Sequence, residues 1–378
     1  MDWRASHKMK ILHYMPVPSK IYNKIFIDMI QNDSRFNEDE HIFWILTEES
    51  YQISKNEKNV YLKKKHLVSE FKKINNYVDV IIIHGFEFKF YELLCLNSDI
   101  RRKMAWVVWG HDLYRIKDIT QRTPKEMLKY FIKKILYKHL QVPFVKKIKC
   151  IGIGFPYDAV EIKKWYGDKV IKSAPYGMGY NFENIKKIKK NTQKNIEKKQ
   201  TINILLGHSA YEYLRHIENL KRLQNYQGKN IKIFIPLSYG NSAYMERIKK
   251  HIEKVSMNIE LLTELLTEEQ YLEFLSNIDI AIFDFKHQAA LGNIYLLLYF
   301  EKKVYLDAEG VLYKGFKNQN VSVFDTNTIG QVPYEDFTNL NFSTSHGISV
   351  SENIFDLQKV VEDWKELFLY CAEEREYI

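Results

Sequence analysis

Residues 201–209 read Thr-Ile-Asn-Ile-Leu-Leu-Gly-His-Ser and join a short apolar strand to a glycine-containing loop. A helical pattern follows at Tyr213–Leu223, and the same order of strand, loop and helix then recurs along the chain. Apolar strands that alternate with helices are typical of parallel sheets buried on both faces. This stretch therefore predicts a doubly wound α/β domain in the second half of the chain.

The same alternation extends in both directions from residues 201–209. In the second half, further strands are expected at Lys232–Ile235, Asn258–Leu262, Ile278–Phe283 and Lys303–Leu306, and helices at Ala243–Val255, Glu268–Ser276 and Ala289–Phe300. In the first half, strands are expected at Lys10–Tyr14, His41–Leu46, Val78–His84, Lys103–Trp109 and Lys149–Ile153, and helices around Ser19–Ile30, Phe88–Leu96 and Lys125–Leu140. Thr267 and Gln270 form a capping-box pattern at the start of one helix. Two such sheets in series give the predicted architecture.

The length of 378 residues is enough for two domains. We predict an N-terminal domain over residues 1–180, a Lys-rich exposed linker over 181–200, and a C-terminal domain over 201–350. Residues 351–378 are expected to return to the first domain as a helix. Within them, Ile354–Tyr370 has a wide apolar face that needs a surface to cover.

The net charge of +9 hides an asymmetry between the two halves of the chain. Residues 1–200 contain 39 Lys and Arg against 22 Asp and Glu, whereas the remainder contains 17 against 25. Halves of opposite sign suggest two different binding surfaces. The three cysteines are too few and too scattered for a disulfide framework or a zinc site. Without an apolar leader or a membrane-length apolar run, the sequence predicts a cytoplasmic protein.

Three loops of the second domain follow predicted strands, at the sheet edge where open α/β folds bind ligands. They contain Gly207-His208-Ser209, residues 236–241 (Pro-Leu-Ser-Tyr-Gly-Asn) and residues 284–293 (Asp-Phe-Lys-His-Gln-Ala-Ala-Leu-Gly-Asn). Hydroxyls, amides, a lysine and two histidines beside helix N-termini suit a diphosphate. Ordinary connecting loops are the alternative, because the chain lacks a G-x-G-x-x-G motif or a P-loop.

The first domain has polar residues at two strand ends. His84-Gly85 follows one strand, and Trp109-Gly110-His111-Asp112 follows the next. His84 and Asp112 are candidate bases for a hydroxyl nucleophile, with His111 the next candidate. The alternative for His84 is a hydrogen-bonded histidine of the sheet.

Residues 105–114, Ala-Trp-Val-Val-Trp-Gly-His-Asp-Leu-Tyr, resemble the W-x-x-W-G-x-D-L-Y segment of the bacterial TDP-N-acetylfucosamine:lipid II N-acetylfucosaminyltransferases. The His84-Gly85 pair lies upstream, as in that family. Further matches follow in order between about residues 80 and 325, at residues 204–209, His216-Ile217, Pro236, Tyr239, Asn241, Tyr244, Gln288, Gly292 and residues 296–298.

The resemblance implies a metal-independent GT-B glycosyltransferase with two Rossmann-like domains facing across a cleft. It implies transfer of an N-acetylfucosamine-like deoxy-amino sugar from a TDP-linked donor to a lipid-linked saccharide acceptor, in enterobacterial common antigen or O-antigen synthesis. No cofactor or metal is expected, and the enzyme would act at the inner face of the bacterial inner membrane. The donor would contact Gly207, His208, Ser209, Arg215, Pro236, Tyr239, Asn241, Lys286, His287, Gln288 and Gly292. Tyr239 is a candidate to stack on the base, or it merely packs.

The chain departs from the family where the donor phosphates would bind. Where the family has Gly-Asp-Arg after Ser209, this chain has Ala210, Tyr211 and Glu212, and His287 replaces a later arginine. Arg215 is a possible substitute for the missing cation. Another nucleotide, UDP or GDP, is therefore an alternative, and a catalytically degenerate or binding-only protein is a second one.

Residues 125–149 carry eight lysines and one glutamate, with aliphatic residues at helical spacing. A basic amphipathic helix of this kind binds anionic membrane surfaces. The lysines expected to face the lipid are Lys129, Lys133, Lys134 and Lys138. The alternative is a core helix with a solvated lysine face. Nucleic acid is not an expected partner, because no recognition motif accompanies the basic charge.

Overall fold

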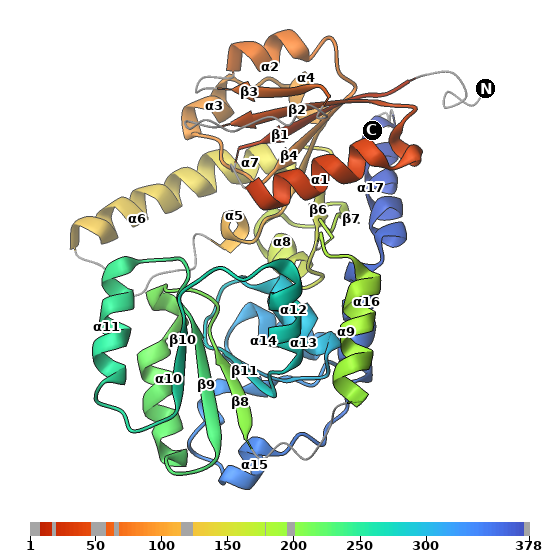
Figure 1. The fold of residues 1–378 in the computed structure, drawn as a ribbon. Coiled ribbons are helices and arrows are strands. Elements are labelled where there is room, and N and C mark those ends of the chain that lie inside the picture. The colour runs from red at the N-terminus through yellow and green to blue at the C-terminus, as the bar shows by residue number, and fades with distance from the viewer. Residues whose placement is uncertain are drawn as a thin grey trace. The chain divides into compact units, whose positions relative to one another are not determined.

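The computed structural model describes residues 8–16, 20–46, 58–63, 68–114, 124–177, 179–194 and 201–373 (Figure 1). The chain divides into two compact units. The N-terminal unit comprises residues 1–179 and 357–378, and the C-terminal unit comprises residues 180–356.

The N-terminal unit is built on a seven-stranded parallel sheet in the order β3-β2-β1-β4-β5-β6-β7. Its strands are β1 Lys10–Met15, β2 Glu40–Leu46, β3 Val60–Lys63, β4 Val80–His84, β5 Met104–Val107, β6 Cys150–Ile153 and β7 Ile171–Ser173. Its α-helices are α1 Lys20–Asn32, α2 Val68–Ile74, α3 Phe90–Cys95, α4 Ser98–Arg102, α5 His111–Tyr114, α6 Pro124–Leu136, α7 Val142–Lys146, α8 Asp158–Tyr166 and α17 Leu357–Ala372.

The C-terminal unit has a six-stranded parallel sheet in the order β10-β9-β8-β11-β12-β13. Its strands are β8 Ile202–Leu206, β9 Ile231–Pro236, β10 Ile259–Leu262, β11 Ile280–Phe283, β12 Lys303–Leu306 and β13 Phe324–Asp325. Its α-helices are α9 Phe182–Lys194, α10 His216–Leu223, α11 Ser242–Ile252, α12 Glu268–Ser276, α13 Leu291–Tyr299, α14 Val311–Asn318, α15 Tyr334–Thr338 and α16 Ser345–Phe355. This strand order is that of a Rossmann fold, and the predicted doubly wound architecture is confirmed.

Every strand predicted from the sequence is present, with ends shifted by a few residues. The strands that the sequence did not predict, β3, β7 and β13, have four, three and two residues, lie at the edges of their sheets and are mostly not buried, so they lack a clear apolar run. The capping box of Thr267 and Gln270 is present at the start of α12.

The segment expected to be an exposed linker is instead helical over Phe182–Lys194 and belongs to the C-terminal unit. Ile185 is fully buried, and the ring of Phe182 packs against Tyr299 and Phe355. The prediction gave more weight to the high lysine content of this segment than to its narrow apolar stripe, and therefore missed the helix. Residues 195–200 lie outside the described residues.

Helix α17 belongs to the N-terminal unit, although it comes last in the sequence. Val360, Val361, Trp364, Leu367 and Phe368 are buried against the sheet and α1, in one apolar core. Figure 1 shows this helix in blue beside α1, in red, and near β7. The apolar face of α17 therefore completes one side of the N-terminal unit.

Candidate active site

The loop after β5 is organised around the carboxylate of Asp112. This side chain is fully buried. One oxygen accepts hydrogen bonds from the backbone N–H groups of Trp109 and Leu113, both at 3.0 Å. The other accepts from the Phe86 N–H at 2.8 Å and the Trp106 indole at 2.7 Å. Four donors occupy the carboxylate, so the structure gives Asp112 a positioning role and does not support the predicted role as base.

His84 at the end of β4 also lies away from solvent. Its Nε2 is 3.1 Å from Nδ1 of His13, and its Nδ1 meets the hydroxyl of Tyr176. Burial lowers the pKa of His84 to about 3, because the charged imidazolium loses its hydration. A histidine this reluctant to accept a proton is a poor base near neutral pH, so the structure favours the structural alternative for His84.

His111, at the start of α5, is exposed, unlike Asp112 and His84. Its Nε2 lies 3.0 Å from a carboxylate oxygen of Glu87, which follows β4 by three residues. An ionised carboxylate can only accept, so this hydrogen bond fixes the proton on Nε2 and the lone pair on Nδ1. The pair has the arrangement of a histidine base with an orienting acid. Sequence reasoning did not select Glu87, although its place just beyond a strand end was a usable signal.

In the C-terminal unit, the loops after β8 and β9 are joined by backbone hydrogen bonds. The Ala210 N–H donates to the Tyr239 carbonyl, and the Asn241 N–H donates to the Ala210 carbonyl, both at 2.8 Å. Gly240 has a φ of +126°, and a Cβ there would lie 2.7 Å from the Ala210 backbone. Asn241 also caps α11 by accepting from the Tyr244 N–H at 2.9 Å. Two of the predicted donor loops therefore form one rigid edge.

In and next to the predicted donor loops, several buried polar atoms have no hydrogen-bond partner among the described residues. They are Nδ1 of His208, both ring nitrogens of His216 and Oε1 of Gln288. Burial, with a smaller contribution from His287, lowers the pKa of His208 to about 4. Gly207 has a φ of +72° and a Cβ there would lie 2.5 Å from His216 Nε2, so no larger residue fits this turn. Unsatisfied buried polar atoms are costly, and a polar ligand would repay that cost.

Three exposed tyrosines follow the same two strands; Tyr211, Tyr213 and Tyr239 are named the tyrosine platform below. They are 38–49% exposed. The rings of Tyr211 and Tyr213 are stacked with centroids 5.6 Å apart, and Tyr239 meets Tyr211 edge-on at 6.5 Å. His287 packs edge-on against Tyr213 at 4.5 Å. Of the three, only Tyr239 was selected from the sequence; the other two replace or follow the family's charged residues, which was the available signal.

The cations at this edge are paired with carboxylates. Nη1 of Arg215 lies 3.4 Å from Asp284 and 3.3 Å from Asp307, two buried acids that follow β11 and β12. Arg215 also has a left-handed backbone, with a φ of +50°.

Two exposed pairs complete this charge pattern. Lys286 forms an ion pair with Glu309, which raises the pKa of the lysine. Glu212, where the family has an arginine, pairs with Arg247 of α11 at 2.6 Å. The local charge is close to balanced, so binding of a diphosphate depends on helix N-termini or on a change of ion-pair partners.

Helix α13 supplies one such N-terminus. Gln288 precedes it and Gly292 lies in its first turn, and the first hydrogen bond back into the helix runs from Ile294 N–H to the Ala290 carbonyl. The N–H groups before Ile294 have no partner within the helix, as at any helix start. Pro236 ends β9 on the same edge of the sheet.

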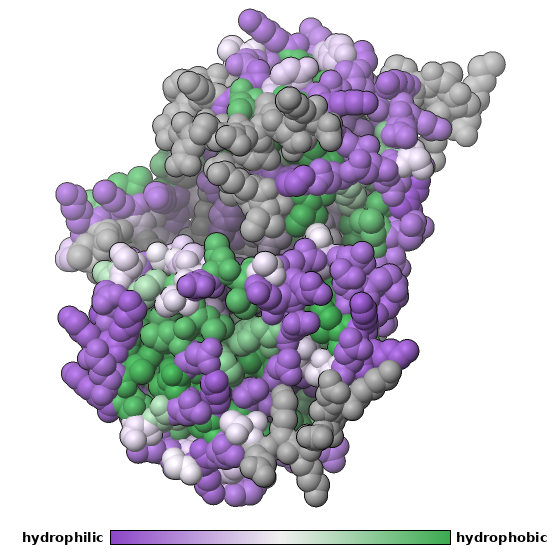
Figure 2. All heavy atoms as spheres, viewed as in Figure 1, coloured by the Kyte–Doolittle hydropathy of each residue, from purple (hydrophilic) through white to green (hydrophobic). Residues whose placement is uncertain are grey.

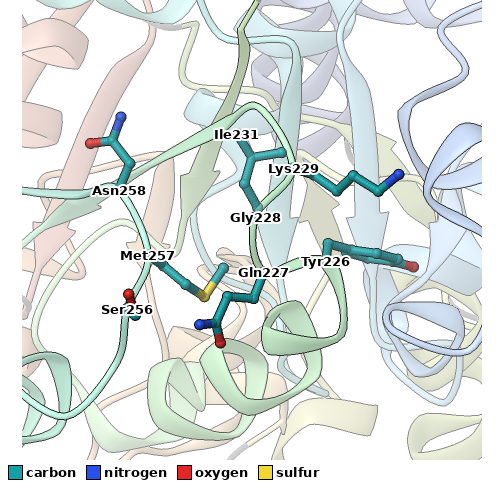
Figure 3. A pocket seen from close by; sticks show the side chains of 8 residues that line it. All are labelled: Tyr226, Gln227, Gly228, Lys229, Ile231, Ser256, Met257 and Asn258. Carbon is teal, nitrogen blue, oxygen red and sulfur yellow. The ribbon is translucent and has the colours of Figure 1, made fainter.

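A separate pocket of about 380 Å³ lies in the C-terminal unit, at the opposite edge of the sheet (Figure 3). Residues 226–229, Ile231 and residues 256–258 line it, around the starts of β9 and β10. Ligands of open α/β sheets bind at the other strand ends. This pocket is therefore not part of the candidate site.

In the parts of the chain that the structure describes, no three His, Cys, Asp or Glu side chains come together as a metal site requires. No helix among the described residues is long and apolar enough to span a membrane.

Comparison with known proteins identifies both a family and a fold. The family model of the 4-alpha-L-fucosyltransferases, glycosyl transferase group 56, matches residues 11–334. Among solved structures, a glycosyltransferase from Rickettsia africae is 13% identical with a TM-score of 0.60, over 97% of this chain and 98% of that one.

Two further structures have the same architecture. The Anabaena protein HepE in complex with UDP and glucose is 10% identical, with a TM-score of 0.59 over 96% of this chain and 99% of the other. A UDP-forming trehalose-phosphate synthase from Burkholderia xenovorans is 9% identical, with a TM-score of 0.57 over 97% and 99%. At these identities the likeness shows the fold, which is the GT-B fold of glycosyltransferases.

Proposed function

The chain belongs to the 4-alpha-L-fucosyltransferase family, glycosyl transferase group 56, and from this we propose that it transfers an N-acetylfucosamine-like deoxy-amino sugar from a TDP-linked donor to a lipid-linked saccharide. The product would enter bacterial surface polysaccharide synthesis, of the enterobacterial common antigen or O-antigen type. The observation that carries the chemistry is the exposed His111–Glu87 pair, in which His111 lies within the segment that resembles the family's motif.

In the proposed reaction, the bond between the sugar C1 and the donor phosphate breaks, and a bond from C1 to the acceptor oxygen forms. The acceptor hydroxyl loses its proton to Nδ1 of His111, while Glu87 holds the Nε2 proton and stabilises the imidazolium that results. The departing nucleoside diphosphate gains negative charge as the bond breaks. The N–H groups at the start of α13, with Lys286 released from Glu309, are the proposed partners of that charge.

The tyrosine platform is proposed to hold the base of the donor. Stacking on aromatic rings contributes about 1–3 kcal/mol per base and does not depend strongly on which base it is. The buried atoms of His208 and Gln288 that have no partner among the described residues are candidates for polar contacts with the donor. UDP- or GDP-linked donors are the second candidate, favoured by Glu212, because a carboxylate replaces the family's arginine and is bound to Arg247.

A panel of TDP-, UDP- and GDP-linked deoxy sugars tests the donor assignment, with release of nucleoside diphosphate as the readout. Fastest release from a TDP-sugar supports the first candidate, and faster release from a UDP- or GDP-sugar replaces it with the second. If no nucleotide sugar is bound or turned over at millimolar concentration, the proposed function is wrong.

Helix α6 supports a lipid-linked acceptor through its surface. Its apolar residues Met127, Leu128, Phe131, Ile132 and Ile135 are 43–61% exposed. They lie within one stripe of the helix, and Figure 2 shows hydrophobic atoms at the surface in the region of α6. Lys129, Lys133, Lys134 and Lys138 are all exposed on or just beyond the same helix. Exposure of this stripe argues against the core-helix alternative and fits insertion between anionic headgroups, at about 1 kcal/mol per lysine near the surface.

Co-sedimentation with phosphatidylglycerol vesicles tests this surface. Binding is expected at low salt, weakening as salt rises, and Phe131→Glu is expected to abolish it. Leu94→Glu is a matched control, because Leu94 of α3 is 70% exposed but lies outside the stripe. Absence of wild-type binding at low salt, or equal loss in both variants, contradicts the membrane role.

A further inference from the structure

Three histidines form a continuous hydrogen-bonded row through the core of the N-terminal unit. His41, His13 and His84 lie on β2, β1 and β4, which are neighbours in the sheet. His13 Nε2 is 2.9 Å from His41 Nδ1, and His13 Nδ1 is 3.1 Å from His84 Nε2. The register pairs His13 with Phe43 and with Ile82, so each histidine is displaced by two residues from its neighbour. Side chains at such diagonal positions share a face of the sheet and are within reach of each other.

The row continues from His84 to the loop that carries His111. The Tyr176 hydroxyl contacts His84 Nδ1 and accepts a hydrogen bond from the Trp109 indole at 2.6 Å. Trp109 is the residue before Gly110 and His111. The five residues Trp109, Tyr176, His84, His13 and His41 are called the histidine chain below.

The donors and acceptors of these groups select one direction of hydrogen-bond donation along the histidine chain, from Trp109 toward His41. An indole N–H only donates, so the Tyr176 oxygen is its acceptor. The hydroxyl hydrogen of Tyr176 has no acceptor other than His84 Nδ1 among the described residues. His84 then carries its proton on Nε2 and donates to His13, and His13 donates from Nε2 to His41. The opposite direction would leave the Tyr176 hydrogen without a partner in addition to His41 Nε2.

The histidines along this row are neutral. Burial is the largest cause lowering their pKa values, to about 4 for His41 and about 3 for His84, and well below 6.5 for His13. Neutral histidines that each donate once and accept once form a chain with a single set of tautomers.

Helix α17 covers the histidine chain from the other end of the sequence. The ring of Trp364 stacks on His84 with centroids 5.7 Å apart, and its indole N–H donates to the Pro175 carbonyl at 2.7 Å, next to Tyr176. Phe368 packs edge-on against His13 at 5.5 Å. Helix α17 thus fixes the position of the histidine chain.

We propose that the histidine chain is a positioning device that holds Trp109, and with it the loop of His111, in the geometry that transfer requires. The three histidines are positioning residues, and none of them takes the substrate proton. All three are Nε2–H tautomers whose direction is set by the Tyr176 hydroxyl, which accepts from Trp109 and donates to His84. The catalytic part of this inference rests on the proposed function, whereas the tautomer part does not.

Nitrogen NMR of ¹⁵N-histidine-labelled protein tests the tautomer part. His13, His41 and His84 are expected as neutral Nε2–H tautomers at pH 7. In Tyr176→Phe the direction is no longer imposed, so the nitrogen shifts of His41 are expected to change, although His41 does not contact residue 176. Nδ1–H tautomers in the wild type, or unchanged His41 shifts in the variant, overturn the proposal even if the protein is an active transferase.

Tyr176→Phe tests the positioning part, with Tyr166→Phe as the control. Both remove one buried phenol hydroxyl from the N-terminal unit, and Tyr166 bonds to Tyr137 outside the histidine chain. Tyr176→Phe is expected to lower kcat about tenfold, because one hydrogen bond that positions the loop of His111 is lost. The donor KM is expected to stay unchanged. The control keeps wild-type kcat. An unchanged kcat in Tyr176→Phe overturns the positioning role, whereas inactivity of the wild type with every donor contradicts only the proposed function.

Discussion

Two sheet edges of this protein differ in how their buried polar groups are paired. The N-terminal edge carries His84 and Asp112, and the C-terminal edge carries the predicted donor loops. At the N-terminal edge, Asp112 accepts four hydrogen bonds and the buried histidines bond to one another. At the C-terminal edge, His208, His216 and Gln288 keep buried polar atoms that have no partner in the described part of the chain, and aromatic rings are exposed. Apart from His41 Nε2, the groups of the first edge named here are satisfied by the protein itself, whereas the second has unsatisfied groups that a ligand would complete.

This difference assigns different tasks to the two edges. A self-satisfied network holds a loop in place before any substrate arrives, which suits the presentation of a base. An edge with unpartnered atoms gains stability from a bound nucleotide. Substitutions at the first edge should therefore lower the rate of transfer or the stability of the fold, and those at the second should lower donor affinity.

Replacement of the exposed His111 is the most direct test of the difference between the two edges. His111→Ala is expected to lower kcat by about 10²–10⁴-fold, because the acceptor hydroxyl loses its general base. Donor affinity, measured by calorimetry, should not change. His139→Ala is the control, since His139 is also exposed in the N-terminal unit but lies outside the loop. Transfer at the wild-type rate in His111→Ala would remove the base assignment.

Acid should weaken the N-terminal unit before carboxylates titrate. The unfolded histidines take up protons below about pH 6.5, while the folded pKa values of His41 and His84 are lowered to about 4 and 3. The stabilisation is thus complete above about pH 6.5 and is lost as the pH falls toward 4. The expected slope is about 1.4 kcal/mol per pH unit for each such histidine.

Tryptophan fluorescence reports this unit alone, because all six tryptophans lie within residues 1–179 and 357–378. Urea unfolding at pH 7.5, 6.5 and 5.5 gives the slope. His41→Asn should reduce the slope, and His139→Asn should leave it unchanged. A stability independent of pH between 7.5 and 5.5 would contradict the burial of neutral histidines.

Much of this fold was predictable, because longer strands and helices show a regular local spacing of apolar residues in the sequence. The strands of both sheets and the return of an apolar C-terminal face follow from patterns in one stretch of chain. The role of Asp112 did not follow, because its four donors come from the loops after β4 and β5, from α5 and from Trp106 inside β5. A carboxylate at a strand end looks the same in sequence whether it meets solvent or buried N–H groups.

The histidines show the same limit. His13 and His41 lie inside strands and gave no sequence signal, since a histidine within an apolar run reads as an isolated exception. Only the sheet order β2-β1-β4 brings them to His84. Glu87, Tyr211 and Tyr213 were likewise missed, because pairing and stacking depend on which loops become neighbours. Residue types at strand ends were predictable, but their partners required the topology.

Gly240→Ala tests whether the C-terminal edge depends on the contact between its two loops. A Cβ there meets the Ala210 backbone at 2.7 Å, so the loops must separate, and nucleotide affinity is expected to fall about tenfold. Gly228→Ala is a matched control: Gly228 also has a positive φ, but a Cβ there has no atom within 4 Å. It lies at the pocket on the opposite edge. Calorimetry with TDP should show lost affinity only in Gly240→Ala, and equal loss in both variants would make backbone strain the cause.

The smallest expected effect concerns one ring of the tyrosine platform. Tyr211→Ala removes the ring stacked on Tyr213 and should weaken TDP binding about fivefold to tenfold, the lower part of the range for a base stacked on an aromatic ring. Tyr211→Phe keeps the ring and should keep most of the affinity. Tyr91→Ala, an equally exposed tyrosine of the N-terminal unit, should have no effect. If Tyr211→Ala binds TDP as the wild type does, the exposed rings are not a base platform, and the C-terminal edge would have to bind its nucleotide through His208, Gln288 and the start of α13.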